Sequence, residues 1–166
     1  MISATDRAAL SDLVHRYAAG VDDREFDAVA ALFATDGQLI VPDPPGELRP
    51  THPHRGREAI AAAVGAVAAV PRTEHAIVGE VYDVYDDMYD DMYDDAGRHG
   101  AARGRIACVA HHWDQRAGEV VDVVWHLRYD DDYKLTDAGW RIARRALTIN
   151  AIETRPVRRL LPRDSA

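Results

Sequence analysis

The sequence predicts an α+β fold, in which a curved antiparallel (mixed) sheet wraps around N-terminal helices and encloses an apolar pocket. Two observations support this fold class. Helical patterns dominate the chain before Pro71, and period-two alternation, which is typical of strands, dominates after it. The sequence contains neither a GxGxxG motif nor a P-loop, so nothing in it indicates a nucleotide-binding fold.

Two long helices are predicted in the N-terminal part. Residues 5–21 carry apolar side chains at helical spacing, and residues 56–70 form an alanine-rich helix that ends before Pro71. Between the two helices, the Pro-rich stretch 42–55 is predicted to be a loop.

A shorter helix is predicted directly after the first. Asp22, followed three residues later by Glu25, resembles a capping box, in which two side chains bond to the free N–H groups at a helix start. The helix would carry the apolar residues Phe26, Val29, Leu32 and Phe33. Asp36-Gly37 is expected to end it, and a strand is expected to begin at Gln38.

Four strands are predicted beyond Pro71, at residues 75–85, 103–114, 120–135 and 140–153. The third strand places five apolar side chains on one face: Val121, Val123, Trp125, Leu127 and Tyr129. We expect this face to line the pocket, with Trp125, Leu127 and Tyr129 contacting a mostly apolar ligand.

An acidic repeat lies between the first two of these strands, where a Tyr-Asp-Asp unit occurs three times. Seven aspartates fall between Asp83 and Asp95, and they contribute −7 of the formal net charge of −8. Calcium loops need a glycine turn and a carboxylate at the far end of the loop, and the repeat has neither. We therefore expect an acidic hairpin insertion at about residues 86–102, solvated because like charges repel, and no metal site in it.

Length and composition predict one soluble domain, residues 1–155, followed by a basic tail, residues 156–166. Nucleic acid is not an expected partner, because the chain lacks a clustered basic surface. No apolar stretch is long enough to cross a membrane, and the N-terminus does not resemble a signal peptide. A single cysteine, Cys108, fits a reducing cytoplasm.

A metal motif is suggested by one stretch and is not supported by its predicted structure. Gly46, His52, His54, Glu58 and Gly65 have the spacing of the first cupin metal motif. Cupin ligands sit on strands, whereas residues 57–70 are predicted to be helical, and no second cupin motif follows. We expect no metal and no cofactor. A site made of His52, His54 and the pair His111-His112 stays open as an alternative.

Three features carry groups suited to acid–base chemistry. Asp22 ends the first helix, five residues after Tyr17, and His75 opens the first long strand. His111 and His112 lie in the middle of the next, apolar strand. Imidazole has an unperturbed pKa of about 6.5, so a histidine kept basic by a carboxylate can remove a proton from carbon.

Over about residues 5–155 the chain resembles the SnoaL-like family of the nuclear transport factor 2-like superfamily. The motifs that carry the resemblance are "YAAGVDDREFDAVAALFATDG", "GREAI", "RTEH" and "RYDDDYKLTDAGWRIARR". The resemblance implies a cone-shaped α+β barrel with a deep pocket, a homodimer or higher homo-oligomer, and a hydrophobic small-molecule substrate.

The resemblance also implies roles for particular residues. Scytalone dehydratase, hexachlorocyclohexane dehydrochlorinase and bile acid 7α-dehydratase pair an aspartate at the end of the first helix with a histidine that opens a long strand, which match Asp22 and His75. By the same resemblance, Tyr17 and Arg145 match further catalytic residues. A second catalytic histidine corresponds to His111 or His112.

The register of the strands favours His112. A tight turn at Ala117-Gly118 pairs Arg116 with Glu119 and therefore His112 with Val123, on the face shared by Trp125. A shift of one residue would select His111 instead.

Together these features predict a cofactor-independent lyase or isomerase of the dehydratase type that acts on a hydrophobic cyclic small molecule. Elimination of water, a proton-shift isomerisation and an aldol-type cyclisation would all fit this site. His75 would remove a proton, Asp22 would hold its imidazole, and Tyr17, His112 or Arg145 would steady an enolate or protonate a departing hydroxyl. The alternative is a non-catalytic binding or assembly module of the same fold, in which His75 lacks a carboxylate partner or is sealed from the ligand.

Overall fold

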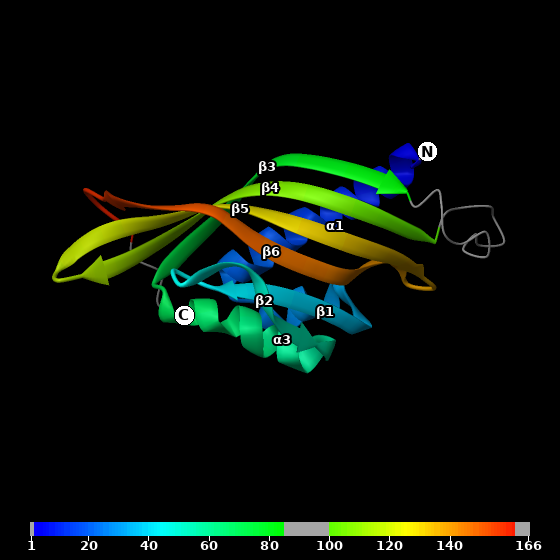
Figure 1. Cartoon of the computed structure of the whole chain (residues 1–166), viewed down its shortest axis with the longest axis horizontal. Helices are drawn as coiled ribbons and strands as arrows, with labels where there is room; N and C mark the ends of the chain where they lie inside the picture. Colours follow the sequence, from blue (N-terminus) through cyan, green and yellow to red (C-terminus); the bar gives the residue numbers. More distant parts are fainter. Residues whose placement is uncertain (1, 85–99, 162–166) are drawn as a thin grey trace.

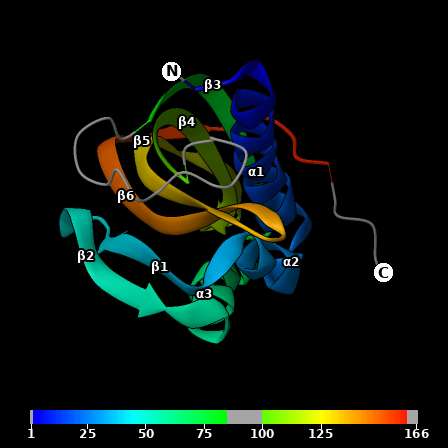
Figure 2. The same ribbon diagram turned by 90° about the vertical axis from the view of Figure 1, so that its right-hand side faces the viewer.

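The computed structural model describes residues 2–84 and 100–161. The predicted acidic insertion and the end of the tail fall mainly outside these residues. The fold is a six-stranded mixed sheet with the helices on its concave side, which confirms the predicted class. The strand order is β2-β1-β6-β5-β4-β3. The sheet curves strongly (Figures 1 and 2) but does not close into the barrel that the resemblance implied.

Helix α1 (Ala4–Asp23) is the amphipathic helix that the sequence predicts. The Ser3 side chain accepts a hydrogen bond from the Asp6 amide and caps the first turn. The buried stripe of the helix packs against the concave face of the sheet, and it contains Leu10, Leu13, Val14, Tyr17 and Val21. Arg24 ends the helix in the left-handed conformation, with φ of 66°.

The predicted capping box is wrong. Asp22 lies inside the last turn of α1, and the cap of α2 (Phe26–Ala31) is Glu25, whose side chain makes no capping hydrogen bond. The carboxylate of Asp22 instead bonds to residues of β3 (Arg72–Val84), far away along the chain.

Strand β1 (Phe33–Asp43) begins earlier than predicted, and Asp36-Gly37 lies within it. Its pairing with β6 (Gly139–Pro156) is parallel and shifts between Phe33 and Gln38, so the Asp-Gly pair marks an irregularity in the strand and not a helix end.

The predicted loop 42–55 is also wrong over most of its length, because residues Glu47–Arg55 form strand β2. β2 pairs with β1 at the edge of the sheet, where Val41 opposes His52. Prolines are tolerated in an edge strand, because one side of the strand needs no ladder hydrogen bonds. The helical segment that follows is α3 (Gly56–Gly65), continued by the 3₁₀ helix η1 (Ala66–Ala69).

The remaining strands are β4 (Ala101–Arg116) and β5 (Glu119–Thr136). Ala117 and Gly118, with φ of 51° and 84°, form the tight turn between them. Arg116 opposes Glu119 and His112 opposes Val123, as the turn predicted. The local turn thus determines which face of the sheet each histidine occupies. None of the described helices is long and apolar enough to cross a membrane.

We predict that Gly20→Ala destabilises the protein. A methyl group at Gly20 would lie 2.7 Å from Cγ2 of Val29, a buried β-branched side chain at the contact between α1 and α2. Overpacking of this kind costs about 1–3 kcal/mol, against a gain of about 1 kcal/mol in helix propensity. Urea unfolding measures the difference. Gly46→Ala is the control, because its methyl would meet no atom closer than 3.7 Å. Equal effects of the two substitutions would contradict the packing argument.

Candidate active site

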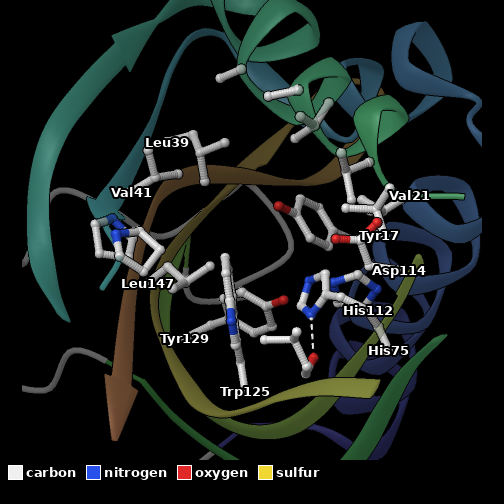
Figure 3. A pocket seen from close by; sticks show the side chains of 18 of the residues that line it. Tyr17, Val21, Leu39, Val41, His75, His112, Asp114, Trp125, Tyr129 and Leu147 are labelled. Atoms are coloured by element: carbon white, nitrogen blue, oxygen red, sulfur yellow. Dashed lines mark hydrogen bonds between the residues drawn. The ribbon is translucent and has the colours of Figure 1, made fainter. Parts of the chain in front are cut away.

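A cavity of about 360 Å³ lies on the concave side of the sheet (Figure 3). Most of its lining is aliphatic or proline, from α1, β1, β6 and the α3–η1 segment. The polar and aromatic groups of the lining are Tyr17, His75, His112, Asp114, Arg116, Trp125 and Tyr129. Such a cavity suits an apolar ligand that a few fixed polar groups orient.

Asp22 and His75 meet at this cavity. His75 Nδ1 lies 2.7 Å from Asp22 Oδ1, and the His75 amide donates to Asp22 Oδ2 at 2.8 Å. The hydroxyl of Thr73 donates to Oδ1 at 2.8 Å. The last turn of α1 thus supplies the carboxylate, and the first residues of β3 supply three donors to it.

Thr73 and Arg24 belong to this arrangement, although the sequence analysis missed them. Arg24 Nη1 donates to the Thr73 hydroxyl at 2.8 Å, and Nη2 donates to the carbonyl of Val70 at 2.8 Å. The signal for Thr73 was its position two residues before His75, which places both side chains on the same face of a strand.

The hydrogen bonds determine the protonation of the pair. Burial acts to raise the pKa of Asp22, but the hydrogen bonds and the attraction from His75 outweigh it, so the pKa of Asp22 is lowered. An ionised Asp22 only accepts, so the proton of the neutral imidazole sits on Nδ1 and Nε2 of His75 is left as an acceptor. The His75 side chain is 9% exposed and lines the cavity.

His112 faces the same cavity from β4. Its Nδ1 donates to the carbonyl of Val123 at 3.0 Å, the dashed line in Figure 3, and its ring lies 5.9 Å from the ring of His75. The ring of Trp125 packs against that of His112, with the ring centroids 4.4 Å apart. Burial lowers the pKa of His112 to about 4, with a smaller contribution from the neighbouring His75. His112 is therefore neutral near neutral pH.

Two predicted pocket residues lie outside the cavity. His111 occupies the opposite face of β4, where its Nδ1 is 2.7 Å from Asp122 and its ring stacks on Trp113. Leu127 shares a strand face with Trp125, but it is buried in the hydrophobic core and does not border the cavity.

Tyr17, Tyr129 and Arg145 form a layered group at the cavity wall. The rings of Tyr17 and Tyr129 line the cavity, with centroids 5.7 Å apart. Arg145, which the resemblance matches to a catalytic residue, does not border the cavity: it is fully buried against both rings. It pairs with Asp131 on β5, behind the rings.

The alternative metal site does not assemble. His52 and His54 lie on the edge strand β2, opposite Val41 and Leu39. Within residues 2–84 and 100–161, no group of three or more His, Cys, Asp or Glu side chains is arranged to hold a metal ion.

We predict that Asp22→Asn lowers the free energy of unfolding by about 1–3 kcal/mol at about pH 6, because charge-assisted hydrogen bonds are lost. The lowered pKa of Asp22 stabilises the fold above its ordinary value of 3.8, and this contribution is lost as the pH falls through the lowered pKa. The difference between the wild type and the variant should therefore shrink towards about pH 3 in urea unfolding. Asp23→Asn, at an exposed neighbour, is the control. A difference independent of pH would contradict this account.

We predict that the imidazole resonances of His112 titrate near pH 4. Because the unfolded chain takes up this proton at about 6.5, stability should fall as the pH drops from 6.5 towards 4. NMR titration measures the pKa, and His112→Gln assigns the signal and should remove part of the slope. A midpoint at the ordinary value would show that His112 is solvated.

Comparisons with known proteins agree with this fold. A hexachlorocyclohexane dehydrochlorinase, LinA type 2, has a TM-score of 0.72 at 14% identity, with 97% of this chain and 96% of that chain covered. A scytalone dehydratase-like protein from Novosphingobium aromaticivorans has a TM-score of 0.70 at 20% identity, with 98% and 95% covered. The Kfla4162 protein from Kribbella flavida has a TM-score of 0.69 at 25% identity, with 90% and 93% covered.

The two neighbours with 14% and 20% identity show only that the fold is shared. No curated protein matches the chain in sequence. Residues 3–146 match the model of the SnoaL-like domain. The chain therefore belongs to the SnoaL-like domain family.

Proposed function

We propose that the protein is a cofactor-independent lyase or isomerase that removes a proton from carbon in a hydrophobic, cyclic small molecule. The observation that carries the proposal is the contact between His75 Nδ1 and Asp22 Oδ1, 2.7 Å apart, beside a largely apolar cavity. A histidine held in one tautomer by an ionised carboxylate is a suitable general base.

Each residue of the pair has a separate part in this chemistry. Nε2 of His75 accepts the proton, and the C–H electron pair stays with the substrate. Asp22 keeps the imidazole oriented and stabilises the imidazolium that forms, which is worth more in an apolar cavity than in water. Thr73 and Arg24 hold the carboxylate in place from behind.

Tyr17 and His112 supply the other polar contacts. Burial raises the pKa of Tyr17, so its hydroxyl stays protonated and can donate to oxygen. His112 donates its Nδ1 proton to Val123, so in the neutral ring Nε2 is an acceptor for a substrate hydroxyl. This pattern orients a molecule that carries both a hydroxyl and a second oxygen.

Elimination, isomerisation and cyclisation can all begin with this proton removal. Two structural neighbours, which share only the fold with this chain, are named as a dehydrochlorinase and a scytalone dehydratase-like protein, and both names denote eliminations. In an elimination, the electron pair of the broken C–H bond forms a C=C bond and expels the leaving group.

The rival function is a non-catalytic binding module. It requires that His75 lacks a carboxylate partner or is sealed from the ligand. The hydrogen bond with Asp22 and the place of His75 in the cavity lining support catalysis instead.

The test is proton exchange at carbon. Wild-type protein incubated in D₂O with a panel of apolar cyclic carbon acids should incorporate deuterium into one class of compound, as measured by mass spectrometry. His75→Gln should lower the rate by about a hundredfold or more, as expected for loss of a general base. His111→Gln is the matched control, since His111 also contacts an aspartate at 2.7 Å but lies outside the cavity. Exchange that persists in His75→Gln would overturn the assignment.

A further inference from the structure

Two charged residues of the cavity lining, Asp114 and Arg116, have no part in the proposed proton removal. They follow His112 at alternate positions of β4, so the three side chains lie on one face of the strand, and all three line the cavity. Figure 3 shows Asp114 on the same side of the cavity as His75 and His112. Within the described part of the chain, the lining holds no other charged side chain besides the two histidines.

The cavity opens towards these two residues. The side chain of His75 is 9% exposed, whereas those of Asp114 and Arg116 are 36% and 58% exposed. The pairing of β4 with β3 ends at Trp113, so the β4–β5 hairpin continues beyond the start of β3 (Figure 1). The histidines therefore lie at the inner end of the cavity. The outer end, formed by Asp114 and Arg116, is the cavity mouth.

The two side chains at the mouth differ in how fully their polar atoms are used. Oδ1 of Asp114 accepts a hydrogen bond from the amide of Gln115 at 2.8 Å, and Oδ2 accepts one from Nε of Arg116 at 3.4 Å. Nη1 and Nη2 of Arg116 have no partner among the described residues. Glu119 opposes Arg116 across the turn but does not border the cavity. The guanidinium thus keeps two nitrogen donors in one plane, a geometry suited to a carboxylate.

The place of the guanidinium sets a length for the ligand. A strand advances by about 3.3 Å per residue, so Asp114 and Arg116 lie about 7 and 13 Å along β4 from His112. Because Nε of Arg116 contacts Asp114, the guanidinium lies between these two positions. A molecule whose reacting carbon lies at the histidines would therefore reach Arg116 with a group about 7–13 Å from that carbon.

We propose that Arg116 is a specificity-determining residue that binds a carboxylate of the substrate at the cavity mouth. This inference rests on the proposed function, because it names the substrate class of the same cavity. The substrate is an apolar cyclic compound with a carboxylate about 7–13 Å from the carbon that loses the proton. Its ring lies at the inner end, beside Trp125, and its carboxylate stays at the half-exposed mouth, where it keeps part of its hydration.

Binding of phenylalkanoates tests the site without turnover. Phenylacetate, 6-phenylhexanoate and 8-phenyloctanoate are each compared with the primary amide of the same length by isothermal titration calorimetry. The ratio of the two affinities is the readout, because the acid and the amide share all contacts of ring and chain. The wild type should prefer the two longer acids by about threefold to fivefold, the upper range for an exposed ion pair. The preference should be smaller for phenylacetate and should decrease at high salt.

Matched variants assign the preference to one side chain. Arg116→Gln should bring 6-phenylhexanoate and its amide to about equal affinity, because the charge is lost. Arg116→Lys should keep part of the preference, because an ammonium group retains the charge without the planar donors. Arg128→Gln is the control and should keep the whole preference. Arg128 also donates to an aspartate two residues away, Asp130 at 2.9 Å, but it is not part of the cavity lining.

The outcomes also separate this inference from the proposed function. In His75→Gln the preference for the longer acids should persist while deuterium exchange is lost. The carboxylate site is overturned if the wild type binds acids and amides alike at every length, if no acid binds, or if Arg116→Gln keeps the preference. A wild type that prefers the acids but exchanges no carbon acid would overturn the proposed function alone.

Discussion

The carboxylate of Asp22 holds together the parts from which the candidate site is built. It accepts hydrogen bonds from the Thr73 hydroxyl and from the backbone amide of His75, and it contacts the imidazole. These contacts tie the last turn of α1 to the first residues of β3. Arg24, which ends the helix in the left-handed conformation, adds a second link through Thr73 and Val70. The position of the helix end and the orientation of the imidazole therefore depend on the same few bonds.

Four groups that line the cavity, His75, His112, Tyr17 and Tyr129, share one feature: each contacts a partner that lies behind it. Asp22 orients His75, the carbonyl of Val123 orients His112, and the Arg145 guanidinium packs against the phenols. In a largely apolar cavity, groups that are already oriented need no reorganisation when charge develops, and their electrostatic effect is greater than in water. In the proposed function, this arrangement would favour a charged intermediate without a cofactor.

The errors of the sequence predictions have a common physical cause. Proline in 42–55 indicated a loop because proline disrupts ladders, but the pairing of β2 with β1 at the sheet edge makes it harmless. Asp22 with Glu25 matched a capping box, but the Asp22 carboxylate accepts hydrogen bonds from Thr73 and His75 of β3 and does not cap α2. In each case pairing with another element of the fold overrode a local preference, within a hairpin for β2 and across about fifty residues for Asp22. Leu127 was predicted to line the pocket because it lies on the same strand face as Trp125. Alternation along a strand shows which face a side chain occupies, but not where along the strand the cavity ends.

The sequence by itself determined the helix of residues 5–21, the order of the long strands and, through the Ala117-Gly118 turn, the register that separates His112 from His111. These features depend on periodicity and turn geometry, which act over a few residues. Only the tertiary structure decided that Asp22 and Thr73 meet, that Arg145 lies behind two phenols, and that the sheet stays open. Those contacts join residues far apart in the chain, so they are determined by how the sheet curves around the helices and not by any local pattern.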